Sequence, residues 1–316
     1  MEHAGPGPVR LLTRSQVRGL LAWPGLIEAA EHALVAIATA DSVAAQSGQL
    51  RVPGASLHLK SGALGPVLSV KANLRPDAGS SAGVILAFDP ARFTLRAILD
   101  SADITAMRTA AIAAVAARRL ARPGGQVVAI LGTGPVGAHA LAALQHAVPV
   151  SSVRLWSRRP EPADELAAAW PGLAVACGSA AEAAAGAGIV VTATPSRRPL
   201  LQRSDLAPDA LVLAMGADSP GKRELGEGVL ADATIVADVL ADALAVGECA
   251  YLPAAAGRAA CVELGAVLAG SHELPAAAGR VVFDSVGSAV VDAAVTGLVV
   301  ALAEHDDIGT SVILGA

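Results

Sequence analysis

A glycine-rich stretch at residues 126–137, QVVAILGTGPVG, constrains the fold more than any other part of the chain. Its apolar run at 127–131 predicts a buried strand, and apolar residues at helical spacing follow it. Between them, Gly132, Gly134 and Gly137 give the spacing G-x-G-x-x-G. This order of strand, turn and helix is typical of dinucleotide binding, because N–H groups at the helix N-terminus can receive a pyrophosphate. The alternative is a structural glycine turn.

Apolar runs that alternate with helical stretches follow this unit and predict a doubly wound parallel sheet. The expected strands lie at 153–156, 173–176, 189–194, 211–215, 234–237 and 281–283, and the expected helices at 163–170, 179–185, 203–206 and 227–230. The predicted fold class is therefore α/β, with a Rossmann-type dinucleotide-binding domain over residues 121–288.

The N-terminal part of the chain has a different character. Residues 13–40 predict two helices, with Thr13 as an N-cap, and 104–121 predicts a third. Short β-type runs separated by Gly, Pro, Asp and Ser, typical of an antiparallel meander, lie at 56–59, 67–72, 83–87 and 93–99. The run 288–304 is apolar on all sides, so we expect it to pack back onto the N-terminal part or at a subunit interface.

Length and composition fit two domains and exclude several classes of protein. The chain has 316 residues, of which 53% are hydrophobic but only 2% aromatic, so its cores are built largely from aliphatic residues and alanine. A net charge of −5, without a basic stripe, argues against nucleic-acid binding. The N-terminus lacks an apolar signal segment, and glycines, prolines and histidines interrupt the uncharged run 123–153. We therefore expect a cytoplasmic protein without a membrane partner.

Cysteine and histidine patterns predict neither a disulfide framework nor a metal site. The three cysteines, Cys177, Cys249 and Cys261, are odd in number and form no C-x-x-C pair. We expect them to be buried thiols in a reducing compartment. The seven histidines occur singly and none forms H-x-x-x-H.

The end of the second Rossmann strand carries a signal for the cofactor. An NAD-binding unit usually places an Asp or Glu there for the ribose 2′-hydroxyl, whereas this chain has Ser157, Arg158 and Arg159. A hydroxyl and two guanidinium groups suit a 2′-phosphate, because Arg binds phosphate through charge-assisted hydrogen bonds. We predict NADP(H), with NAD(H) possible. The alternative is two solvated arginines on a loop.

Two further groups of residues are candidates for chemistry. Asp218 follows the strand 211–215 in a Gly/Pro-rich loop, where a carboxylate suits general acid–base work as well as a simple turn. In the first domain, Arg51, Lys60, Lys71 and Arg108 are either exposed charges or a cation cluster that binds a substrate carboxylate.

Four motifs together identify a family resemblance. The segments DITAMRTAAIAA (103–114), AILGTGPVG (129–137), MGADSPGKREL (215–225) and FDSVGSAVVD (283–292) resemble the ornithine cyclodeaminase/mu-crystallin family in order and spacing. The resemblance implies a Rossmann domain joined to an α+β substrate-binding and dimerisation domain from both chain ends, here 1–120 and 289–316. It also implies a homodimer that moves hydride between a nicotinamide and the α-carbon of an imino or amino acid.

The resemblance assigns roles to individual residues. Asp218 matches the catalytic aspartate, Arg108 and Lys71 match groups that hold the substrate carboxylate, and Arg51 matches a further carboxylate-binding arginine. The expected cofactor contacts are Gly132, Thr133, Gly134, Pro135, Val136, Gly137, Ser157, Arg158, Arg159, Thr194, Met215, Gly216, Ser285, Val286 and Gly287.

Departures from the family pattern favour one reaction over others. Ornithine-specific members carry an acidic residue before the lysine, whereas here the segment 56–60 reads Ser-Leu-His-Leu-Lys. We therefore expect an NADPH-dependent imine or ketimine reductase, or an enzyme of the amino-acid dehydrogenase type. The alternatives are an ornithine or lysine cyclodeaminase with bound NAD, which releases ammonia, and a non-catalytic binding protein like mu-crystallin.

Overall fold

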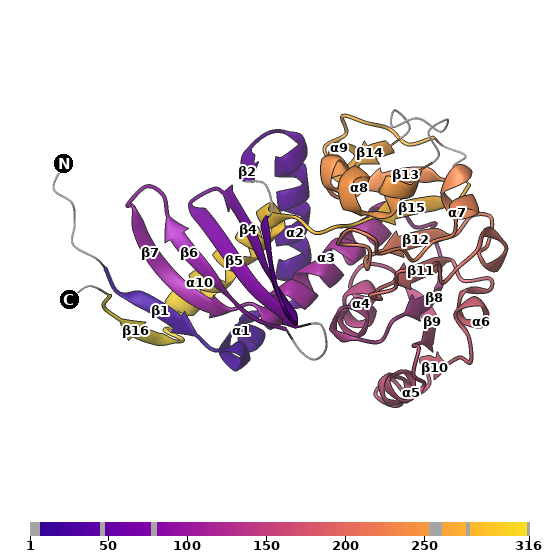
Figure 1. Cartoon of the computed structure of the whole chain (residues 1–316), viewed down its shortest axis with the longest axis horizontal. Helices are drawn as coiled ribbons and strands as arrows, with labels where there is room; N and C mark the ends of the chain where they lie inside the picture. Colours follow the sequence, from indigo (N-terminus) through magenta and orange to yellow (C-terminus); the bar gives the residue numbers. More distant parts are fainter. Residues whose placement is uncertain (1–6, 45–47, 77–80, 253–260, 276–278, 315–316) are drawn as a thin grey trace. The chain divides into compact units, whose positions relative to one another are not determined.

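The chain divides into two compact units. The computed structural model describes residues 7–44, 48–76, 81–252, 261–275 and 279–314. The first six residues, which belong to the N-terminal segment predicted to lack a signal sequence, lie outside this set. The first unit comprises Met1–Arg108 and Ser288–Ala316, and the second Thr109–Gly287. Both chain ends thus belong to the first unit (Figure 1). The division falls inside the helix α3 (Ala102–Leu120) rather than at its end.

The first unit is built on an eight-stranded sheet in the order β16-β1-β7-β6-β5-β4-β2, with β3 paired to β4. Its strands are β1 (Val9–Leu12), β2 (Ser42–Ala44), β3 (Gly48–Val52), β4 (Ala55–Leu64), β5 (Val67–Pro76), β6 (Ala82–Asp89), β7 (Thr94–Asp100) and β16 (Thr310–Val312). The predicted antiparallel meander is confirmed by β4 to β7. The short strands β1, β2, β3 and β16 were not predicted, because so few residues show no clear alternation.

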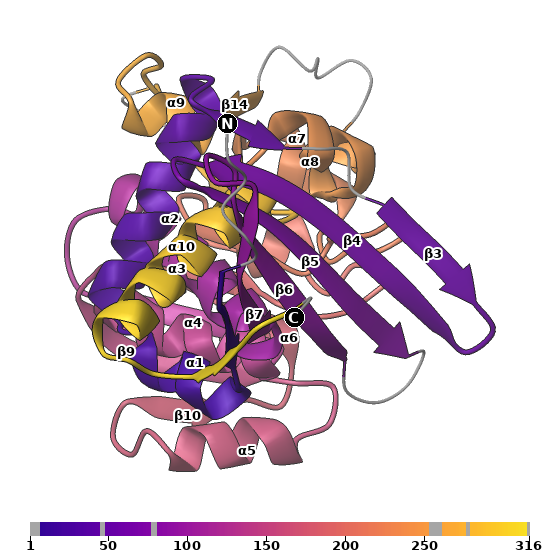
Figure 2. The ribbon, with the colours of Figure 1, turned by 90° about the vertical axis from the view of Figure 1, so that its left-hand side faces the viewer.

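Three helices complete the first unit: α1 (Arg14–Leu20), α2 (Trp23–Ala38) and α10 (Ala289–His305). The expected return of the apolar C-terminal helix is confirmed, since α10 packs on α2, β4 and β5 (Figure 2). Glycine permits this close approach: a Cβ on Gly62 of β4 would lie 2.7 Å from the carbonyl carbon of Ala289. No single helix in the described part of the chain is long and apolar enough to cross a membrane; α1 and α2 pass that test only as a pair bent by 88°.

Alternation along the strands gives the first sheet two unlike faces. Opposed residues of antiparallel strands share a face, so the pairs Leu50–Leu57 and Leu57–Leu74 place these leucines on one side. This face, which we name the apolar face, is solvent-exposed at Val43, Leu50, Val52, Leu59, Leu74 and Val84. The other face carries Gly62 and is the one on which α10 packs.

The second unit is an all-parallel eight-stranded sheet in the order β10-β9-β8-β11-β12-β15-β13-β14. Its strands are β8 (Gln126–Leu131), β9 (Val150–Trp156), β10 (Ala174–Ala176), β11 (Ile189–Thr192), β12 (Leu211–Ala214), β13 (Thr234–Ala237), β14 (Cys261–Glu263) and β15 (Val281–Asp284). Its helices are α4 (Pro135–Gln145), α5 (Glu161–Ala168), α6 (Ala180–Ala184), α7 (Glu227–Ala231), α8 (Leu240–Val246) and α9 (Leu264–Leu268), with the 3₁₀ turns η1 (Arg203–Asp205) and η2 (Glu248–Tyr251). This arrangement confirms the predicted Rossmann-type sheet.

Two details of the second unit differ from the prediction. The helix expected at 203–206 is the single 3₁₀ turn η1, which is too short for α-helical hydrogen bonds. The elements α8, η2, β14 and α9 were not predicted, since each is short and its apolar residues show no distinct period.

Candidate functional site

The glycine turn after β8 is shaped to let a ligand approach the backbone. Gly132 has φ +102°, and a Cβ there would lie 2.5 Å from the carbonyl oxygen of Ala193. A Cβ on Gly137 would collide with the carbonyl oxygen of Gly132, so glycine lets α4 begin close to the strand. Gly134 is the N-cap of α4, and a Cβ there would meet only open space. Free N–H groups at this helix N-terminus can therefore receive an anion.

A pocket of about 610 Å³ opens beside this turn. Its lining is Gly132, Thr133, Gly134, Trp156, Ser157, Arg158, Arg159, Pro162, Ala193, Thr194, Pro195, Ser196, Arg197, Arg198 and Leu200, without one acidic residue. The Thr133 hydroxyl oxygen is buried and has no hydrogen-bond partner. A buried polar atom costs free energy unless it is paired, so this hydroxyl fits a phosphate oxygen of a bound dinucleotide.

Four arginines line this pocket and give it a positive charge. Arg158 and Arg159 follow β9, where the sequence placed them, and Arg197 and Arg198 follow β11. All four side chains are exposed. The Ser157 hydroxyl donates to the backbone carbonyl of Arg159 at 2.5 Å and so shapes the loop. The second pair was not predicted, although an Arg-Arg pair just after a Rossmann strand is the same signal that revealed the first.

The other residues predicted to contact the cofactor are not among the residues that line this pocket. Pro135 and Val136 form the first turn of α4, and Met215 and Gly216 follow β12. Residues 285–287 follow β15 and are fixed by Asp238, which accepts from the Ser285 hydroxyl and the Gly287 N–H, both at 2.7 Å. Their contacts with a cofactor remain predictions.

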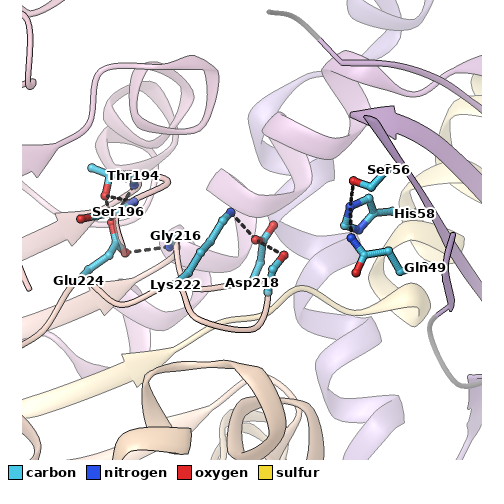
Figure 3. A network of polar contacts seen from close by, with 10 residues as sticks. Gln49, Ser56, His58, Thr194, Ser196, Gly216, Asp218, Lys222 and Glu224 are labelled. Atoms are coloured by element: carbon cyan, nitrogen blue, oxygen red, sulfur yellow. Dashed lines mark hydrogen bonds and ion pairs between the residues drawn. The ribbon is translucent and has the colours of Figure 1, made fainter. Parts of the chain in front are cut away.

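Glu224 joins the ends of two neighbouring strands (Figure 3). Its fully buried carboxylate accepts from the Thr192 hydroxyl at 2.7 Å. It also accepts from the N–H and hydroxyl of Thr194 and from the Gly216 N–H, at 2.7–2.9 Å. Burial raises the pKa of Glu224, and these hydrogen bonds oppose that shift. Thr194 therefore lines the pocket with its hydroxyl already donated to Glu224. Sequence reasoning missed Glu224, because nothing in the sequence shows which donors surround it.

Further buried carboxylates support the same strand ends. Glu248 accepts from the Glu224 N–H at 2.5 Å, and Asp284 accepts from the Cys249 N–H at 2.8 Å. Burial raises the pKa of Glu248 to about 8 and that of Asp284 to about 7. These groups order the loops and lie outside the described pocket lining.

Asp218 lies in the loop that Glu224 anchors through Gly216. Its N–H donates to the Gly216 carbonyl at 3.0 Å. Its carboxylate receives the Lys222 ammonium at 2.5 Å and the Ser219 hydroxyl at 3.0 Å (Figure 3). The side chain retains 25% exposure, so Asp218 is a partly solvated carboxylate with an adjacent ammonium.

In the first unit, Lys71 and Arg108 meet at one carboxylate that the sequence analysis did not select. Asp292 of α10 lies 2.5 Å from the Lys71 ammonium and 2.9 Å from Arg108 Nε, and all three side chains are at least 94% buried. Burial would raise the pKa of Asp292, but the two cations outweigh it and bring that pKa down to about 2. The predicted carboxylate-binding residues are thus brought together around a charged Asp292.

Lys60 adds a third cation to this group. It faces Lys71 directly across β4 and β5. Burial, together with repulsion from Arg108 and Lys60, lowers the pKa of Lys71 to about 7 against the attraction of Asp292. Lys71 and Arg108 are two buried basic residues at the one carboxylate of Asp292, an arrangement that suits a further anionic group. Arg51 lies apart, exposed on β3 and opposite Ser56.

Comparisons with known proteins show the family of this chain. The family model described as the ornithine cyclodeaminase/mu-crystallin family matches residues 37–306. The chain belongs to this family. Ketimine reductase mu-crystallin of Mus musculus is 34% identical over 215 residues, 68% of this chain and 67% of that protein. Iminosuccinate reductase of Paracoccus denitrificans is 32% identical over 232 residues, 72% of each protein.

Two solved structures show the same fold. An archaeal alanine dehydrogenase dimer with bound NAD superposes with a TM-score of 0.91 at 25% identity, covering 97% of this chain and 99% of that one. The Paracoccus denitrificans iminosuccinate reductase in complex with NAD⁺ gives a TM-score of 0.90 at 27% identity, covering 98% and 100%. The family resemblance and the fold class predicted from the sequence are both confirmed.

Proposed function

We propose that the chain is an NADPH-dependent reductase of α-imino acids. The observation that carries the proposal is the buried pair of Lys71 and Arg108 at the carboxylate of Asp292, with the half-buried Lys60 opposite Lys71. Such an excess of positive charge in a nearly dry site is matched by a ligand carboxylate. Relatives named as ketimine and iminosuccinate reductases support this choice.

In this proposal, each part of the chain has one task. Lys71 and Arg108 bind the α-carboxylate and so fix the orientation of the C=N group, a positioning effect that supplies much of the rate. Asp218 transfers a proton to the imine nitrogen. The nicotinamide, when bound, supplies the hydride that the α-carbon receives. Hydride and proton together convert the C=N bond into a C–N single bond and leave an amino acid.

The pocket of the second unit supports NADP(H) over NAD(H). Arg158, Arg159, Arg197 and Arg198 line it and no acid does, whereas a carboxylate is the usual partner of an unphosphorylated ribose. We expect NADPH to bind at least about tenfold more tightly than NADH, a difference of about 1.4 kcal/mol. Arg158→Ala is expected to reduce that ratio, and titrations of nucleotide fluorescence measure it.

The rival reaction is cyclodeamination. L-lysine cyclodeaminase of Streptomyces rapamycinicus is 32% identical over 234 residues, 72% of this chain and 67% of that protein. A substrate with a side-chain amine favours a nearby carboxylate, but β3, β4 and β5 contain no Asp or Glu. The test is NADPH oxidation with a panel of cyclic imino acids, beside ammonia release from ornithine and lysine. Ammonia release without NADPH oxidation would overturn the reductase proposal.

We also propose that the chain forms a homodimer. The apolar face of the first sheet exposes large aliphatic side chains at Leu50, Leu74 and Val84. A contiguous exposed apolar surface of this kind marks a protein–protein interface. The related archaeal alanine dehydrogenase is described as a dimer, which supports the same state for this chain.

A further inference from the structure

The segment that follows β11 forms one wall of the pocket beside the glycine turn. It touches that turn at its start, since a Cβ on Gly132 would lie 2.5 Å from the carbonyl oxygen of Ala193. Arg197 lies further along the segment and lines the same pocket, as do Gly132 and Gly134. A glycine turn of this kind receives the pyrophosphate of a dinucleotide at the helix N-terminus. Arg197 therefore extends from a segment that borders the expected pyrophosphate position.

Backbone hydrogen bonds hold this segment in place on both sides of Arg197. The Arg223 N–H donates to the Ser196 carbonyl at 2.9 Å. The Leu200 N–H donates to the carbonyl of Glu224 at 2.7 Å. Arg197 thus projects from an ordered backbone, so little further backbone freedom is lost when its guanidinium group binds an anion.

The guanidinium group of Arg197 lies against the Asp218 loop. A Cβ on Gly221, in that loop, would be 2.8 Å from Arg197 Nη1. The loop follows β12, whereas Arg158 and Arg159 follow β9, and the sheet order is β9-β8-β11-β12. At about 4.8 Å between neighbouring strands, the ends of β9 and β12 are about 14 Å apart. In this arrangement, a phosphate held at the end of β9 does not contact Arg197.

We infer that Arg197 binds the pyrophosphate of the dinucleotide, while Arg158 and Arg159 bind the 2′-phosphate. This inference rests on the proposed function and divides its cofactor site into two phosphate subsites. No acidic residue is among the described residues that line the pocket, and hydrogen bonds from Arg to phosphate are charge-assisted. NADPH and NADH share the pyrophosphate and differ in the 2′-phosphate. Arg197 therefore adds affinity for either nucleotide, and the choice between them depends on Arg158 and Arg159.

Nucleotide affinities of one variant test this division. Arg197→Ala in the full-length protein is expected to weaken NADPH and NADH binding by the same factor, about tenfold, because a charge-assisted hydrogen bond is lost. Titrations of nucleotide fluorescence measure both dissociation constants, at one ionic strength because salt screens exposed charges. The ratio of the two constants should stay within about twofold of the wild-type ratio. Unchanged affinity for both nucleotides, or a loss confined to NADPH, would overturn the inference.

Two fragments of the cofactor separate the subsites directly. ADP-ribose carries the pyrophosphate without a 2′-phosphate, and 2′-AMP carries the 2′-phosphate without a pyrophosphate. Arg197→Ala should weaken ADP-ribose binding about tenfold and change 2′-AMP binding less than about twofold, and Arg158→Ala should do the reverse. Displacement of bound NADPH by each fragment measures these affinities. Weaker binding of 2′-AMP to Arg197→Ala, with ADP-ribose binding unchanged, would contradict the inference.

Arg119→Ala is the matched control. Arg119 is also an exposed arginine of the second unit, in the last turn of α3, and it does not line this pocket. Its loss changes the net charge by the same amount and should leave all these affinities unchanged. Both variants should melt close to the wild-type temperature, because both side chains are exposed. An equal loss of affinity in the two variants would assign the effect to overall charge and overturn the inference.

The proposed function and this inference can fail separately. Wild-type protein that binds NADH as tightly as NADPH would overturn the proposed cofactor preference. The effect of Arg197→Ala on both nucleotides would still decide the inference. If the wild-type protein binds neither nucleotide, the proposed reductase and the inference both fail.

Discussion

At the scale of single residues, Asp218 combines partial exposure with a close cation. Its carboxylate holds the Lys222 ammonium at 2.5 Å, so exchanging it for an amide alters proton transfer while nearly conserving shape. Asp218→Asn is expected to lower kcat by about 10²-fold or more, in the usual range for general acid–base groups. NADPH affinity and melting temperature, measured alongside, should stay close to wild type. Turnover within about tenfold of wild type, about 1.4 kcal/mol of transition-state stabilisation, would exclude the role.

The lowered pKa of Lys71 predicts the direction in which activity changes with pH. Its pKa is lowered to about 7, so the ammonium that binds a carboxylate is present below pH 7 and is lost above it. We expect kcat/KM, which reports the free enzyme, to fall as pH rises through about 7. Lys71→Arg keeps its charge over this range, so the variant should lack that fall. A profile that is flat between pH 6 and 9 in the wild-type protein would contradict this assignment.

A site residue can be predicted from the sequence when the pattern that marks it lies within a few neighbouring residues. Ser157, Arg158 and Arg159 were found because they directly follow a recognisable strand, and the structure places them in the pocket lining. Asp292 was not selected, because in sequence it is one acid in an apolar helix. Only the packing of α10 on β5 brings it to Lys71.

At the scale of elements, the carboxylate of Glu224 connects β11, β12 and the Asp218 loop. Glu224→Gln replaces one acceptor oxygen with a donor that faces existing donors, leaving a buried group unpaired. We expect a loss of about 1–3 kcal/mol in the free energy of unfolding, measured by urea denaturation, together with weaker NADPH binding. Glu227→Gln, at an 83% exposed side chain on the neighbouring helix α7, is the matched control. Equal stability of the two variants would show that Glu224 does not join these strands.

The sequence predicted long or strongly periodic elements well and short ones poorly. The helices α3 and α10 were predicted nearly in full, because their apolar pattern repeats several times. The ten-residue strands β4 and β5 were predicted only in part, at 56–59 and 67–72, because their alternation is loose. The three-residue strands β2, β14 and β16 contain too few positions to show a period. Their pairing is decided by neighbouring strands far away in sequence, as with Val9 of β1 and Val312 of β16.

For the whole molecule, the exposed apolar face of the first sheet predicts that two copies of the chain form a dimer. Burying its aliphatic side chains against a second copy removes them from water, which stabilises a dimer. We expect the 31.3 kDa chain to sediment at twice its mass at micromolar concentration. Leu74→Arg combined with Val84→Arg, at side chains that are 46% and 42% exposed, should shift it to the monomer.

The control for this prediction makes the same kind of change elsewhere. Val175 of β10 is 57% exposed and belongs to the second unit, so Val175→Arg adds a charge of the same kind, one in place of two, away from the apolar face and should leave the dimer intact. Because charge at an interface core is desolvated while charge on a free surface is not, the two variants separate a specific interface from general solubility. Wild-type protein that sediments as a monomer at every concentration would contradict the dimer, as would dissociation of both variants alike.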